Sequence, residues 1–524
     1  MPGADGAAWT PCLRSPAKLQ RDLIADLEAQ VEALTAALQE KDGWVPGSSS
    51  MNSLSGLSPA SASQGDGQSS TGSDTCANSI LTFIDRHVSV EGQRRAVNAY
   101  SYGFKSVWCP ANLSQQTLQD VRRDSPLLLL TILAFPMAAE VCNNSCSKAN
   151  DLVNGAIDYL GKKVLVEGAH NQEVVRALLT AAFWHRVPRG EVASHCHQYS
   201  RLAVDMAIDI GLGGPEFPGS PAAYFRRMDG HQDDNSGRTW LACYAAATMY
   251  GLNQRRPATV SWSQQHERNL RSMENNGRIE DRLFCQIIML IHLCQQAAEK
   301  LELCNLTVYL DINDTACQQK MAILADQFEG WKSSVPQDLL AHPMVRFWSC
   351  IFDIYLHEVV LHTPTNKSLS AAPHVPPNLP VADFATPQVI TDAAAAATSN
   401  LITACQGAIL ACEDMGPAEV LAAPSMIFAP AVMYALKTLV HVFVTVYGPG
   451  STFGTSNLIV KEDICMRQYI SKVIALGKAV DSSTYTDTYW TGRILGAASW
   501  FETWANDYEV ILERYAEKQR SGEA

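Results

Sequence analysis

The sequence predicts an all-α fold in which a short N-terminal coiled coil and a disordered linker precede a large multi-helix domain. From residue 79 onward apolar residues recur at helical spacing almost throughout, and clear alternating strand patterns are missing. Hydrophobic residues make up 47% of the 524-residue chain, so the helical part can bury a large core.

Residues 18–41 predict a short coiled-coil dimerisation helix. Its apolar residues are spaced 3, 4, 3 and 4 apart, at Ile24, Leu27, Val31, Leu34 and Leu38. With β-branched residues at position a and leucines at d, this pattern favours a parallel two-stranded coil. The run covers little more than two heptads, so an amphipathic helix docked on its own body remains an alternative.

Residues 42–79 predict a disordered Ser/Gly-rich linker. The stretch 47–75 contains eleven Ser and five Gly in 29 residues and has few apolar side chains. Such a segment cannot bury enough surface to offset the entropy lost on ordering. We therefore expect a flexible tether between the coil and the body.

The body divides in sequence into a helical region at 80–363, a Pro-rich loop with six prolines at 364–387 and a C-terminal helical block at 388–520. A typical apolar stripe is Trp348, Phe352, Tyr355 and Val359. The periodicity predicts strong helices at 125–140, 173–185, 194–210, 238–252, 281–303, 345–362, 390–412, 421–447, 464–480 and 490–515.

The bulk composition excludes several classes of protein. A net charge of −13 gives the body no favourable electrostatics for coating nucleic acid, which requires clustered Lys and Arg. The fifteen cysteines are scattered singly and residues 1–13 lack a secretory apolar core, which indicates a reducing compartment. Prolines, a lysine and a histidine interrupt the apolar stretch 420–446, which favours a buried core helix and no membrane partner.

We predict no catalytic and no metal-binding residues. In the His-Cys-His run 195–197 the residues are adjacent, whereas helix residues that share a metal lie three or four apart. Cys142 and Cys146 could supply two zinc ligands, but a structural zinc site needs four and the sequence places no others with them. The histidines of 357–362 are five apart, which turns them about 140° from each other on a helix, unlike HExxH. The run Asp233-Asp234-Asn235 has side chains that could bind magnesium, but it lies in a polar loop and no second acidic motif accompanies it.

Two segments resemble motifs of the fungal zinc-cluster transcription factors. Residues 199–212, YSRLAVDMAIDIGL, resemble the family's A-x-x-M-A-x-x-L-G-L helix, with Gly211 where a left-handed helix cap is expected. Residues 238–244, RTWLACY, followed by Arg256-Pro257, are similar to the signature R-R-x-W-W-x-x-Y … G-R-P.

This sequence departs from that signature: Gly237 stands in place of the first Arg, and Arg255 replaces the Gly before Arg256-Pro257. Residues 354–362 also resemble a recurrent late helix, and the whole match covers roughly 80–447, the family's middle homology region. We expect the motif residues to be structural determinants of the fold; they are Met206, Gly211, Leu212, Arg238, Trp240, Tyr244, Arg256 and Pro257.

Family members carry a six-cysteine binuclear zinc cluster that reads CGG triplets, then a linker, a coiled coil and the helical regulatory region. The resemblance implies a nuclear transcription regulator of a metabolic, and in this family often secondary-metabolite, gene set. It would act as a homodimer, or as a heterodimer with a full-length relative that contacts DNA for it. The effector ligand is unknown.

Only Cys12 precedes the coil, so we expect no cofactor, with zinc only if a cluster lies upstream of this sequence. A chain without the cluster and a chain whose cluster lies upstream remain two alternatives. The rival from another class is a helical enzyme of specialised metabolism that acts on an apolar substrate.

Overall fold

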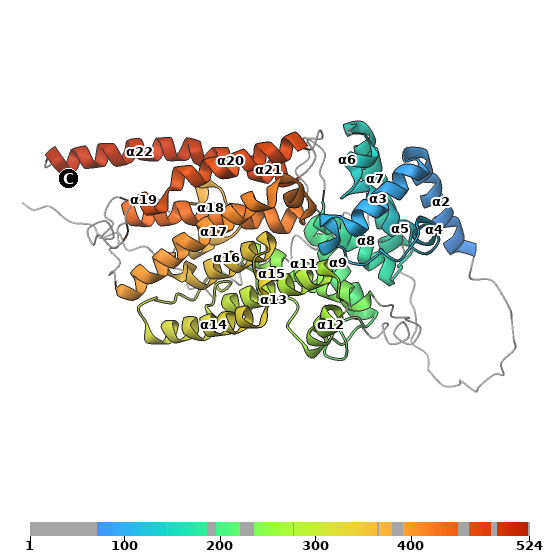
Figure 1. The fold of residues 1–524 in the computed structure, drawn as a ribbon, viewed down its shortest axis with the longest axis horizontal. Coiled ribbons are helices and arrows are strands. Elements are labelled where there is room, and N and C mark those ends of the chain that lie inside the picture. Colours follow the sequence, from blue (N-terminus) through green and yellow to red (C-terminus); the bar gives the residue numbers. More distant parts are fainter. Residues whose placement is uncertain are drawn as a thin grey trace, which may run out of the picture. The chain divides into compact units, whose positions relative to one another are not determined.

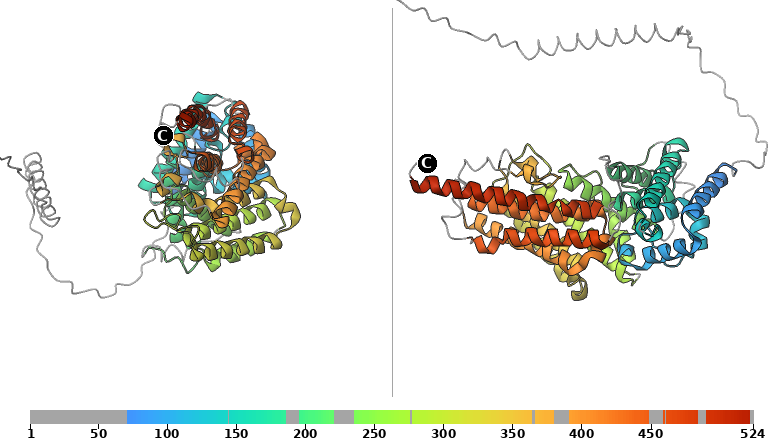
Figure 2. Two further views of the ribbon diagram at one scale, coloured as in Figure 1. Left: turned by 90° about the vertical axis from the view of Figure 1, so that its left-hand side faces the viewer. Right: turned by 90° about the horizontal axis from the view of Figure 1, so that it is seen from above.

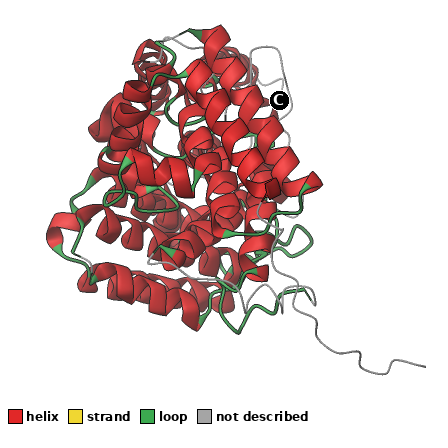
Figure 3. Cartoon of the chain, turned by 90° about the vertical axis from the view of Figure 1, so that its right-hand side faces the viewer, coloured by secondary structure: helices red, strands yellow, loops and turns green. Residues whose placement is uncertain are grey.

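The computed structural model describes residues 71–143, 145–185, 195–220, 235–275, 277–363, 366–379, 391–448, 459, 461–483 and 490–521. Every regular element in this part of the chain is helical, as Figure 3 shows. The predicted all-α class is therefore confirmed. The predicted coiled coil, with Ile24, Leu27, Val31, Leu34 and Leu38, lies outside the described residues.

Figure 1 shows the order of the helices along the chain. The first part contains α2 (Thr71–His87), α3 (Val90–Tyr102), η1 (Phe104–Val107), α4 (Leu118–Asp124), α5 (Pro126–Ala134), α6 (Ala138–Val141), α7 (Cys146–Gly161), the π-helical turn η2 (Lys162–Val166), α8 (Gln172–Phe183) and α9 (Cys196–Asp209). The middle part contains α11 (Ser236–Asn253), α12 (Gln264–Glu274), α13 (Ile279–Lys300), α14 (Thr315–Ser334), α15 (Gln337–Leu340) and α16 (Pro343–His357).

The last part begins with short 3₁₀ turns and ends in long helices. It contains η3 (Glu358–Leu361), η4 (Lys367–Ser370), η5 (Pro376–Asn378), α17 (Asp392–Ala422), α18 (Ser425–Tyr447), α19 (Lys461–Ile464), α20 (Met466–Ser483), α21 (Trp490–Gly496) and α22 (Ala498–Ser521). In both views of Figure 2, α20 and α22 run side by side, in agreement with their packing contacts.

The helices on the two sides of the Pro-rich loop share one core. Residues 69–524 form a single compact unit, and α17, which follows the loop, packs extensively on α16, which precedes it. Within the loop, the described residues 366–379 form η4 and η5 and bury the side chains of Lys367 and His374. The loop therefore separates two stretches of sequence without separating two cores.

Several predicted boundaries shift, each for a local reason. Helix α2 already begins at Thr71, inside the predicted linker, and its residues Cys76, Ile80 and Ile84 are buried. The predicted helix 125–140 is divided into α5 and α6, because Pro136 cannot donate the backbone hydrogen bond that would continue the first helix.

Helices α17 and α18 are long and apolar enough to cross a membrane. In the most apolar window of α18, however, 94% of the residues are buried inside the body, and the corresponding value for α17 is 56%. Helix α18 contacts α8, α11, α17, α20 and α21. The prediction of a buried core helix at 420–446 is thus confirmed.

Candidate functional site

Arg238, the first residue of the signature segment, is 3% exposed near the start of α11. Its Nη1 donates to the carboxylate of buried Asp281 in α13. Its Nε donates to the carbonyl oxygen of Cys109 at 2.6 Å, and Nη2 donates to those of Ser106 and Val107 at 2.7 Å each. Because its charge and its hydrogen bonds are both satisfied, this buried guanidinium ties α11 to α13 and η1.

The two aromatic signature residues lie one turn apart on α11 and have no exposed surface. The hydroxyl of Tyr244 donates to the side-chain oxygen of Gln295 in α13. The ring of Trp240 packs edge-on against Phe217, with 5.2 Å between centroids, and lies 5.3 Å from His266. Both side chains therefore contribute to the packing of α11 against its neighbours.

The motif residues of segment 199–212 lie in α9 and in the turn that ends it. Gly211 adopts a φ of +84°, the left-handed conformation predicted for it. The N–H of Leu212 donates to the carbonyl of Ala207 at 2.9 Å, which closes the helix end. Met206 and Leu212 are each 4% exposed and belong to the core.

Position 255, where the signature has glycine, lies in the turn after α11. Arg255 has a φ of +53°, in the left-handed region that favours glycine. The N–H of Arg256 donates to the carbonyl of Gly251 at 2.9 Å and closes the turn. Arg256 itself is exposed and its Nη1 lies 3.2 Å from Nε2 of His197, while the exposed Pro257 follows it.

Arg255 is the centre of a second buried polar cluster, which sequence reasoning did not identify. Its Nη2 donates to Oε2 of Glu358 at 2.7 Å, and the hydroxyl of Tyr434 in α18 donates to the same oxygen. Its guanidinium carbon lies 5.1 Å from the ring centroid of Tyr355 and 5.3 Å from that of Tyr434. Nη1 of Arg255 and Oε1 of Glu358 have no hydrogen-bond partner among the described residues.

This Arg255 cluster carries an excess of positive charge. Burial lowers the pKa of Lys437 in α18 to about 8, so the ammonium is still mainly protonated at neutral pH. Burial lowers the pKa of His362 to about 4 and that of His374 well below its usual value, which keeps both imidazoles neutral. Arg255 and Lys437 thus face the single carboxylate of Glu358.

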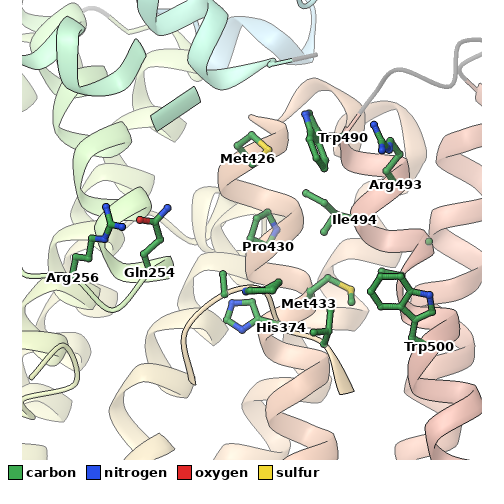
Figure 4. Close-up of a pocket in the computed structure, with 15 residues that line it drawn as sticks. Gln254, Arg256, His374, Met426, Pro430, Met433, Trp490, Arg493, Ile494 and Trp500 are labelled. Atoms are coloured by element: carbon green, nitrogen blue, oxygen red, sulfur yellow. The ribbon is translucent and has the colours of Figure 1, made fainter. Parts of the chain in front are cut away.

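A pocket of about 900 Å³ opens beside this cluster. Figure 4 shows its walls, which come from the turn after α11, the segment 372–375, α18, α21 and the start of α22. The side chains that line it are mainly apolar or aromatic and include Met426, Pro430, Met433, Trp490, Ile494 and Trp500. Large apolar pockets with a few polar groups are the usual form of small-molecule sites.

The charged residues of the pocket are all basic. Arg256 and Arg493 line it, and no described lining residue is acidic. The guanidinium of Arg493 lies 4.8 Å from the ring centroid of Trp490. His374 forms part of the wall, and its pKa is lowered first by burial and then by the charges of Lys437 and Arg255, two buried residues that do not line the pocket themselves.

The metal-like sequence patterns do not come together in the described part of the chain, where no three His, Cys, Asp or Glu side chains converge as a metal site would require. Cys142 is buried and Cys146 is exposed. His357 bonds to the carbonyl of Asp353 at 2.9 Å, whereas His362 lies in the Arg255 cluster. The acidic pair 233–234 lies outside the described residues.

No family model, no curated protein and no solved structure matches this chain.

Proposed function

We propose that this chain is a transcription regulator of the fungal zinc-cluster type, which controls a metabolic gene set in the nucleus. In this proposal the described helices are its regulatory region. The heptads at 24–38 pair it with a second copy or with a related DNA-binding chain.

The backbone at Arg255 is the observation that carries this proposal. The family's signature has glycine at this position, and here the residue adopts the left-handed conformation that glycine adopts most easily. A left-handed backbone at the position where the motif has glycine supports the proposal. The deep burial of Arg238, Trp240 and Tyr244 further supports a shared fold.

The test is a comparison of transcripts after short overexpression of the full chain and of a Leu27→Lys/Leu34→Lys variant. Charges at two d positions prevent a coiled coil from closing. We expect a coherent gene set to respond to the wild-type chain and not to the variant. A Glu28→Gln/Gln30→Glu variant, changed outside the a and d positions, should act like wild type.

An outcome in which no transcripts respond while a metabolite appears or disappears would contradict the proposal. That result would favour the helical enzyme instead. A response that is identical for the wild type and the Leu27→Lys/Leu34→Lys variant would leave transcription regulation standing and reject the pairing role of the heptads.

A further inference from the structure

The pocket beside the Arg255 cluster has a chemistry that selects among ligands. Its described lining combines an apolar and aromatic surface with two arginines and no carboxylate, although the chain as a whole carries a net charge of −13. Arg256 comes from the turn after α11 and Arg493 from α21, and the two lie on different sides of the pocket in Figure 4. The mouth of the pocket is thus locally positive on an acidic protein.

Within the described part of the chain, no acidic side chain neutralises the guanidinium groups of Arg256 and Arg493. Among the described residues neither Arg256 nor Arg493 forms an ion pair; Arg256 lies against His197, and Arg493 lies over Trp490. Arg467, by contrast, is paired with Glu509, and an arginine paired in this way offers less charge to a ligand. Both cations are therefore available to an anion that enters the pocket.

The charge behind the pocket wall has the same sign. Lys437 and Arg255 together exceed the one carboxylate of Glu358, and both act on His374 in the wall. Because these groups are buried, water screens them less than it screens surface charges. The interior of the pocket therefore favours a negative group and disfavours a cation.

We propose that this pocket binds an organic anion with a large apolar body, of the kind represented by an aromatic or aliphatic carboxylic acid. The apolar body contacts Met426, Met433 and Trp500, and the anionic group pairs with an arginine at the mouth. The volume of about 900 Å³ is in the range of sites for drug-sized molecules. The inference goes beyond the proposed function, since binding does not depend on transcription.

The experiment measures binding of two fluorescent probes to the purified full chain. 8-Anilinonaphthalene-1-sulfonate has an apolar body and one negative charge, and N-phenyl-1-naphthylamine is the same body without the charge. We expect one site that binds the anion at least tenfold more tightly than the neutral probe. Equal affinities would overturn the proposal.

Two variants assign the site. Arg256→Gln/Arg493→Gln should lower the affinity for the anionic probe at least tenfold and change the affinity for the neutral probe by less than twofold. Arg514→Gln, at an exposed position of α22, should change neither affinity. Met426→Trp adds bulk to a half-buried lining residue and should abolish binding of both probes. Circular dichroism and the urea midpoint establish that each variant is folded.

If the arginine variant keeps the wild-type preference for the anion, or if Met426→Trp binds both probes normally, this pocket is not the site and the inference fails. Both results are independent of the transcript experiment. A chain that regulates genes without binding the anion, or binds the anion without regulating genes, separates the two proposals.

Discussion

The two ends of helix α11 each hold a buried arginine, and the two are satisfied very differently. Arg238, near the start, has a hydrogen-bond acceptor for every side-chain nitrogen and pairs with Asp281. Arg255, just beyond the end, has no partner for Nη1 in the part of the chain that the structure describes. The buried ring nitrogens of His374 and Nε2 of His362, both in the same cluster, also lack hydrogen-bond partners among the described residues.

The difference distinguishes a structural site from a site with unused binding capacity. A polar group that is buried and fully paired holds elements together, whereas unpaired buried polar groups are rare in folded proteins and call for an explanation. The incomplete cluster lies beside the 900 Å³ pocket, whereas Arg238 and Asp281 of the complete one are 3% and 5% exposed. The comparison therefore supports the binding site that we propose beyond the C-terminal end of α11.

The largest effect should come from the complete site. Arg238→Met leaves Asp281 buried without its cation and three backbone carbonyls without a donor. Because loss of one partner from a buried pair is strongly destabilising, we expect the free energy of unfolding to fall by about 4 kcal/mol. Urea unfolding followed by circular dichroism at 222 nm measures this change.

The matched variant at the other end is Arg255→Met. There Lys437 remains as a cation close to Glu358, and Tyr434 still donates to its carboxylate, so a smaller loss of about 2 kcal/mol is expected. A loss from Arg255→Met that equals or exceeds the loss from Arg238→Met would break the comparison.

The second prediction concerns the surplus cation, Lys437. Its pKa is about 8 in the folded chain and returns to about 10.5 on unfolding, so the unfolded state binds more protons between these values. The contribution of Lys437 to stability is thus most unfavourable below pH 8 and disappears as the pH rises toward 10.5. Lys437→Met should stabilise the chain at pH 7 by an amount on the order of 3 kcal/mol.

The pH dependence gives this prediction its control. Cysteines and tyrosines also titrate in the alkaline range, but they do so in both proteins, so the relevant quantity is the difference in unfolding free energy between variant and wild type. That difference should be constant from pH 6 to 7.5 and should decrease by pH 9.5. An equal difference at pH 7 and pH 9.5 would show that Lys437 does not carry the surplus charge.

The smallest effect should come from a pair with good geometry and little burial. Arg467 donates to both carboxylate oxygens of Glu509, at 2.8 and 2.6 Å, but the side chains are 45% and 36% exposed. Water and side-chain entropy offset most of such an interaction, so Arg467→Gln should lower the unfolding free energy by about 0.5 kcal/mol. A loss above about 2 kcal/mol would show that burial is not what separates the arginine sites.

Part of the site was within reach of the sequence. The signature marked Arg238, Trp240, Tyr244 and the Arg256-Pro257 turn, and helical periodicity placed the first three on one helix. The signal for Arg255 was also present, as an arginine where the family has glycine. It could not be interpreted without the φ of +53° and the carboxylate of Glu358, which lies 103 residues away along the chain.

By itself, the sequence determined the helical class, the buried nature of the apolar stretch 420–446 and the left-handed cap at Gly211, because these depend on spacing and composition over a few turns. Only the tertiary structure decided that the helices on both sides of the Pro-rich loop share one core and that the turn after α11 lines a basic pocket together with α18 and α21. The physical reason is that periodicity predicts which face of a helix is buried, whereas the identity of its partner depends on long-range packing of many similar apolar faces.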